Sequence, residues 1–118
     1  PLDRALFNRH ARYRGRNYAT ISSRGCPYEC AYCCNSLYHR LYPDWRVRRR
    51  SVGHLVGELE AVFREHPEVA QVNFYDDWFL ACPMEHLREF CAEYKARVNR
   101  PFIARTARPM SPRSAWRC

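Results

Sequence analysis

The chain has 118 residues, of which 47% are hydrophobic and 14% are aromatic; this composition is typical of one modest globular domain and excludes a disordered segment. No apolar run approaches the length of a membrane span, and no signal peptide is visible at the start. The formal net charge is +8, but no known nucleic-acid-binding motif accompanies the arginines, so we interpret them as a solvated surface and expect no nucleic-acid partner.

The cysteine content bears on the cellular compartment. Seven cysteines without a secretory signal predict a reducing environment, so we expect a cytoplasmic protein. An odd number of cysteines also argues against complete pairing in disulfides. The chain starts at Pro1 and not at a methionine, and we therefore expect it to be a piece of a longer protein.

The first predicted strand leads directly into a cysteine-rich loop. Residues 1–17 are polar and rich in arginine and are predicted to be a lead-in or linker, so the predicted domain spans residues 18–109. Residues 18–22 are β-prone, and Gly25 allows a sharp turn soon after them. The loop carries Cys26, Cys30 and Cys33. A loop at the carboxyl end of a strand is where a β/α barrel places its chemistry.

An amphipathic helix is predicted after a long connection. Residues 35–50 are assigned to this connection, and Ser51 is a candidate N-cap. Apolar residues then recur at helical spacing, at Val52, Leu55, Val56, Leu59, Val62 and Phe63. Pro67 ends the predicted helix.

A second strand and a second helix repeat this order. Residues 69–75 are predicted to form a strand that ends at the acidic pair Asp76-Asp77. Residues 84–98 have apolar side chains at helical spacing and are predicted to form a helix.

The third predicted strand completes the pattern of an α/β fold. It covers residues 102–104 and is followed by Arg105. Strands that alternate with helices of this length predict βαβ units, with right-handed crossovers and a parallel sheet. Residues 110–118 show no helical pattern and are predicted to be an irregular tail, either truncated or out of frame.

The spacing of the three loop cysteines indicates a metal site. Cys26, Cys30 and Cys33 follow a C-x3-C-x2-C pattern, and thiolates so close repel each other unless a metal centre takes up their charge. Soft sulfur ligands favour zinc, copper(I) or iron–sulfur clusters. A cubane cluster takes four thiolates, so three would leave one iron open. Zinc stays open as an alternative, with His39 as the fourth ligand.

The cysteine spacing, with Tyr32 directly before the last cysteine, resembles the signature of the radical S-adenosylmethionine (radical SAM) family. The resemblance implies a partial (β/α) barrel of parallel strands with crossover helices, truncated here after about the third strand. It implies that Cys26, Cys30 and Cys33 hold a [4Fe–4S] cluster and that S-adenosylmethionine chelates the open iron. By the same resemblance, Tyr32 would lie against the adenine of S-adenosylmethionine.

The acidic pair after the second strand sharpens this interpretation. Adjacent carboxylates after a buried strand need a cation or hydrogen-bond donors, although a turn or helix cap is the alternative. Residues 74–79 look like the Phe-x-Asp-Asp-x-Phe motif of the radical SAM branch that often carries a cobalamin-binding domain. The motif implies that Asp76 and Asp77 bind the amino group of S-adenosylmethionine. Arg105 would be a polar residue facing this cofactor, or merely a solvated one.

The resemblance implies an enzyme that reductively cleaves S-adenosylmethionine to a 5′-deoxyadenosyl radical. An electron donor such as flavodoxin or ferredoxin is expected, and cobalamin would be bound by a domain outside this chain, for methyl transfer or related chemistry. The substrate is not encoded in this stretch. Two alternatives stay open: a zinc-binding basic module that contacts nucleic acid, and a relative of the tRNA methylthiotransferases, which generally lack the acidic pair.

Overall fold

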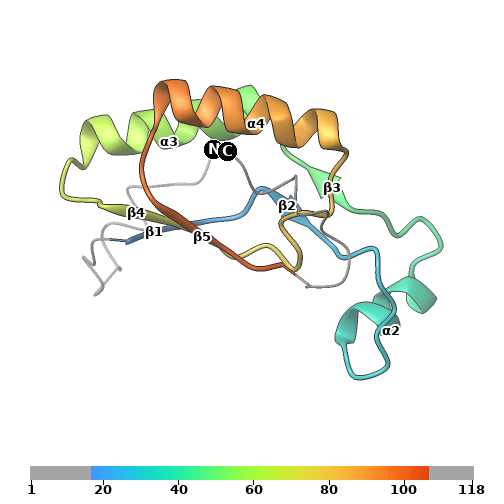
Figure 1. Cartoon of the computed structure of the whole chain (residues 1–118). Helices are drawn as coiled ribbons and strands as arrows, with labels where there is room; N and C mark the ends of the chain where they lie inside the picture. Colours follow the sequence, from blue (N-terminus) through green and yellow to red (C-terminus); the bar gives the residue numbers. More distant parts are fainter. Residues whose placement is uncertain (1–16, 107–118) are drawn as a thin grey trace.

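The computed structural model describes residues 17–106, and its centre is a three-stranded parallel sheet (Figure 1). The strands are β1 (Asn17–Thr20), β4 (Gln71–Phe74) and β5 (Phe102–Ala104), and they lie in the order β1-β4-β5. Both neighbouring pairs are parallel, with Thr20 opposite Phe74 and Phe74 opposite Ala104. The predicted α/β class with a parallel sheet is therefore confirmed. No barrel is formed by the residues that the structure describes.

Two long helices cover one face of this sheet. Helix α3 (Val52–Glu65) lies between β1 and β4 in the chain and follows a short two-stranded ribbon that is described below. Helix α4 (Met84–Arg97) connects β4 to β5. Both helices lie on the same side of the sheet (Figure 1). The Ser51 hydroxyl caps α3 by accepting a hydrogen bond from the His54 backbone N–H at 3.4 Å, as expected for an N-cap serine.

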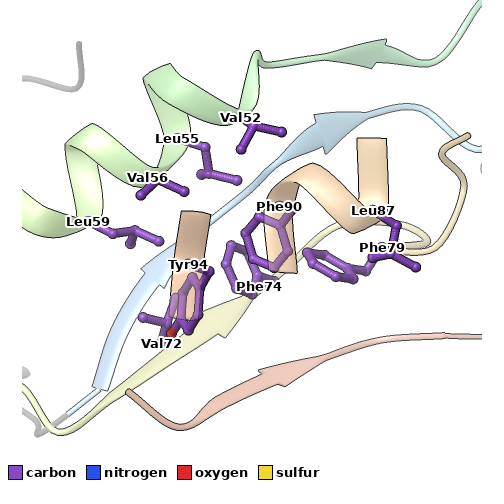
Figure 2. Packing of buried hydrophobic residues seen from close by; sticks show 10 residues of the cluster. All are labelled: Val52, Leu55, Val56, Leu59, Val72, Phe74, Phe79, Leu87, Phe90 and Tyr94. Atoms are coloured by element: carbon purple, nitrogen blue, oxygen red, sulfur yellow. The ribbon is translucent and has the colours of Figure 1, made fainter. Parts of the chain in front are cut away.

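The hydrophobic core lies between the helices and the sheet (Figure 2). Phe74 is at its centre, with its ring centroid 4.9 Å from that of Phe79, 5.8 Å from Phe90 and 5.6 Å from Phe102. Aromatic pairs at these separations add to the stabilisation from burial alone. The other buried members come from α3, α4 and β4: Val52, Leu55, Val56, Leu59, Val72, Leu87 and Tyr94.

The opposite face of the sheet is more polar. Tyr18, Val72 and Phe74 pack toward the helices, and side chains alternate between the two faces of a strand. The other face is therefore formed by Asn17, Ala19, Gln71, Asn73 and Ile103. A parallel sheet with helices on both faces has strands that are apolar throughout, so this sequence is suited to helices on one face only.

The segment at 35–50 differs from the prediction. It was assigned to an irregular connection, but it contains most of α2 (Cys34–Leu41) and all of β3 (Arg48–Arg49), which pairs antiparallel with β2 (Ser23–Arg24). Helix α2 does not bury an apolar stripe, because its buried side chains are the polar residues Asn35 and Ser36. A search for an apolar stripe therefore does not find this helix.

The other predicted elements differ from the structure only at their ends. The strand predicted at 18–22 covers Asn17–Thr20, and the one at 69–75 covers Gln71–Phe74. The helix predicted at 84–98 ends at Arg97, and the third strand lies where it was predicted.

The predicted terminal segments lie mostly outside the described residues. Of the lead-in at 1–17 only Asn17 is described, and it opens β1; the tail at 110–118 is not described. Within residues 17–106, no helix has the length and apolar character needed to cross a membrane.

Replacing Leu59 by alanine should test the core. Leu59 is fully buried on α3, so we expect Leu59→Ala to lower the free energy of unfolding by about 2–5 kcal/mol. Urea unfolding followed by circular dichroism measures the change. Leu41→Ala is the matched control, because Leu41 is 58% exposed on α2; an equal loss in both variants would contradict the packing described above.

Candidate functional site

The loops that follow the three parallel strands meet at one edge of the sheet (Figure 1). The Tyr75 backbone N–H after β4 donates to the Thr20 carbonyl at the end of β1, at 2.9 Å. The Phe79 backbone N–H donates to the Arg105 carbonyl after β5, at 3.0 Å. The structure thus brings together the three segments that carry the predicted site residues: the cysteine loop, the acidic pair and Arg105.

Asp76 holds the start of the cysteine loop against the end of β4. Its carboxylate is 1% exposed and accepts hydrogen bonds from the backbone N–H groups of Ser22, at 3.0 Å, and Ser23, at 2.5 Å. The hydroxyl groups of both serines also donate to it, each at 2.7 Å. A buried carboxylate is tolerated when several donors satisfy it, and here all these donors belong to one short segment.

Asp77 has different surroundings from its neighbour. Its side chain is exposed. Asp76 therefore contacts donors of the protein itself, whereas Asp77 is the member of the pair that is open to a ligand. The predicted role of the pair in cofactor binding stays a prediction, and the geometry makes Asp77 its better candidate.

An aromatic contact links the cysteine loop to the other two strand ends. The rings of Tyr28 and Trp78 lie 4.5 Å apart between centroids, and the Trp78 indole N–H donates to the Thr106 hydroxyl at 3.2 Å. Desolvation, followed by the charges of Cys26 and Cys30, raises the pKa of Tyr28 above its ordinary value.

The cysteine loop is folded back onto α2. Gly25 has a φ of +96°, and a Cβ at this position would lie 3.3 Å from the Trp45 ring, so glycine suits both the backbone and the space. Cys33 immediately precedes α2, and its carbonyl accepts a hydrogen bond from the Ser36 hydroxyl at 2.7 Å. His39 holds the other end, with its Nε2 atom 2.8 Å from the Cys26 carbonyl.

The three loop cysteines are free thiols with access to solvent. Cys26 and Cys33 are half-buried, and Cys30 is exposed. Within residues 17–106, no three side chains of the ligand types His, Cys, Asp and Glu come close enough together to hold a metal ion. The donor chemistry fits a thiolate-bound centre, because three soft ligands lie on one loop; holding it would require the sulfurs to draw together.

Of the remaining predicted residues, Tyr32 and Arg105 lie at the surface, and His39 is half-buried. Tyr32 is 94% exposed at the cysteine loop. Arg105 is exposed, and its guanidinium lies 5.3 Å from the centre of the Tyr75 ring, a distance typical of a cation–π contact. His39, the alternative zinc ligand, has its imidazole against the Cys26 carbonyl and 3.5 Å from the Glu29 carboxylate.

A partly buried ion pair under the end of β1 was not predicted. The Arg50 guanidinium donates to the Glu58 carboxylate of α3 at 2.7 Å, and this carboxylate also accepts hydrogen bonds from the hydroxyl groups of Tyr18 and Thr20 on β1. The pair thus fixes α3 to the strand that leads to the cysteine loop. In the sequence, Glu58 is adjacent to Leu59 of the apolar stripe of α3. This position is the sequence signal that its side chain faces the protein.

Replacing Asp76 by asparagine should loosen the cysteine loop. The amide would present an NH2 group to donors that now face a carboxylate, so we expect a loss of about 2–4 kcal/mol in the free energy of unfolding. Trypsin should also cleave faster after Arg24, which directly follows the serines that Asp76 binds. Asp77→Asn is the matched control, and equal cleavage rates in the two variants would contradict this role of Asp76.

Comparison with known proteins gives no relative: no protein-family model matches the chain, and neither a curated protein nor a solved structure shows significant similarity to it. The candidate site is therefore described by its own geometry. It is an edge of a parallel sheet where a loop of three thiols, an exposed carboxylate at Asp77 and the guanidinium of Arg105 follow neighbouring strands.

Proposed function

We propose that this chain is the N-terminal part of a radical SAM catalytic core, in which Cys26, Cys30 and Cys33 hold a [4Fe–4S] cluster. The observation that carries the proposal is the placement of the cysteine loop. It leaves the carboxyl end of β1 and is bound to the end of the adjacent strand β4 by Asp76. A sheet whose chemistry gathers at the carboxyl ends of its strands is the arrangement of a β/α barrel.

The arrangement of the helices is compatible with a partial barrel. The strands lie side by side in chain order, and both crossover helices cover one face. A barrel places all its helices outside and turns the other face of the sheet inward. The polar side chains of Asn17, Gln71 and Asn73 on that other face suit an interior that contacts a polar ligand.

Each remaining site residue has a role in this proposal that fits its position. Asp77 is exposed beside the loop and would accept hydrogen bonds from the ammonium group of S-adenosylmethionine, and Arg105 is a cation available to its carboxylate. Tyr32, on the surface of the loop, would cover the adenine. When bound, the cluster and S-adenosylmethionine supply the 5′-deoxyadenosyl radical, with an electron from a donor such as flavodoxin or ferredoxin.

The wider biological setting is part of the proposal. Residues 74–79 favour the branch that often carries a cobalamin-binding domain, so we expect cobalamin on a domain outside this chain. The cysteine content without a secretory signal favours a cytoplasmic setting. A relative of the tRNA methylthiotransferases is a weaker candidate, because those enzymes generally lack the acidic pair. A zinc-binding module is the second candidate, because His39 lies against the carbonyl of Cys26 and is a fourth ligand within reach of the loop.

Anaerobic reconstitution with iron and sulfide tests the cluster. We expect broad visible absorption and, after reduction, an electron paramagnetic resonance signal that changes when S-adenosylmethionine is added. Cys30→Ala should abolish both, because it removes one of three ligands. Cys34→Ala is the matched control, since Cys34 is an exposed thiol on the same segment. Stoichiometric zinc without iron–sulfur absorption would contradict the proposal and favour the zinc module.

Replacing Asp77 by alanine tests the binding of S-adenosylmethionine. Loss of a charge-assisted hydrogen bond should weaken binding by about tenfold or more, while the iron content of the reconstituted protein stays unchanged. A titration of the electron paramagnetic resonance signal with S-adenosylmethionine measures the affinity. Glu89→Ala, an exposed acid on α4, is the control, and an unchanged affinity in Asp77→Ala would remove Asp77 from the site.

A further inference from the structure

The two-stranded ribbon β2–β3 places arginines directly opposite each other. Its register pairs Arg24 with Arg48 and Ser23 with Arg49. Like charges opposite each other across an antiparallel pair are destabilising. Among residues 17–106, the ion pairs of arginine side chains involve Arg50 and Arg97, and neither Arg24 nor Arg48 forms one. The ribbon therefore holds a concentration of arginines without direct ion-pair partners.

Two open cavities lie against this ribbon and share Arg24 and Arg48 on their walls. The first has a volume of about 460 Å³ and is also lined by Arg49 and His54. The second has a volume of about 520 Å³ and adds Arg46 and the carboxylate of Asp44. The Glu58 carboxylate reaches the first cavity, where Arg50 neutralises it. Arginines outnumber carboxylates on the walls of both cavities, so both are suited to an anion.

The second cavity has aromatic walls beside its arginines. Tyr42 and Trp45 line it, and their rings are stacked with centroids 6.4 Å apart. The Trp45 indole N–H is buried and has no hydrogen-bond partner within the described part of the chain. A buried donor without an acceptor is costly. The aromatic wall formed by Tyr42 and Trp45 is an observation independent of the charge.

We propose that the β2–β3 ribbon is a binding site for a nucleotide unit, either free or within a strand. Its phosphate would lie between Arg24 and Arg48, whose planar guanidinium groups match the geometry of phosphate oxygens. Its base would contact Tyr42 and Trp45, because aromatic side chains bind bases by stacking. This site lies outside the predicted cluster ligands and replaces the interpretation of the charge as a merely solvated surface.

The experiment uses the full chain treated with a chelator, so that its result does not depend on the cluster. The probes are a nucleoside diphosphate, pyrophosphate and a fluorescent single-stranded oligonucleotide, and binding is measured by calorimetry and fluorescence anisotropy. The double variant R24Q/R48Q should weaken binding of the base-bearing probes by at least about tenfold. The control R88Q/K95Q removes the same charge from exposed positions on α4 and should change affinity by less than about threefold.

A third variant distinguishes recognition of the base from recognition of the phosphate. Tyr42 is 55% exposed, and Tyr42→Ala should weaken the nucleoside diphosphate and the oligonucleotide while leaving pyrophosphate unchanged. If the nucleoside diphosphate binds, a free nucleotide is sufficient to occupy the site. If only the oligonucleotide binds, the ligand is a nucleic-acid strand. Equal losses in R24Q/R48Q and R88Q/K95Q, or no binding of either base-bearing probe at millimolar concentration, would overturn the proposal.

Discussion

The candidate site depends on one buried carboxylate. Asp76 lies at the end of β4 and receives hydrogen bonds from the backbone and hydroxyl groups of Ser22 and Ser23. Without these donors a carboxylate at this depth would be strongly unfavourable, and without the carboxylate the segment after β1 would lose its attachment to β4. The interaction thus fixes where the cysteine loop begins. Its closeness to Asp77 and Arg105 follows from this position.

The two faces of the sheet have separate roles. One face is closed by the side chains of α3 and α4 around Phe74, and burial of this apolar surface is the main stabilising contribution. The partly buried Arg50–Glu58 pair adds a polar attachment between α3 and β1. Within residues 17–106, both attachments hold the sheet from one side. This division is compatible with the partial barrel that we propose.

The parts of the fold that follow a local pattern were predictable. The helix of Leu55 and Leu59 shows a regular apolar stripe, and its capping serine lies at the expected position. Helix α2 was missed because it buries Asn35 and Ser36 and exposes Leu37. The cysteine spacing predicts a metal site, and this stays a prediction. The role of Asp76 was not predictable, because its partners lie more than fifty residues earlier, at separations of 53 and 54, and no local pattern encodes such a pairing.

The most direct test of the account concerns the open iron of the proposed cluster. Electron–nuclear double resonance on the reduced, reconstituted chain would use S-adenosylmethionine labelled isotopically at its amino nitrogen. We expect a hyperfine coupling between this nitrogen and the cluster, because three thiolates from Cys26, Cys30 and Cys33 would leave one iron to be chelated. A reduced cluster whose spectrum shows no coupling to the labelled nitrogen would contradict it.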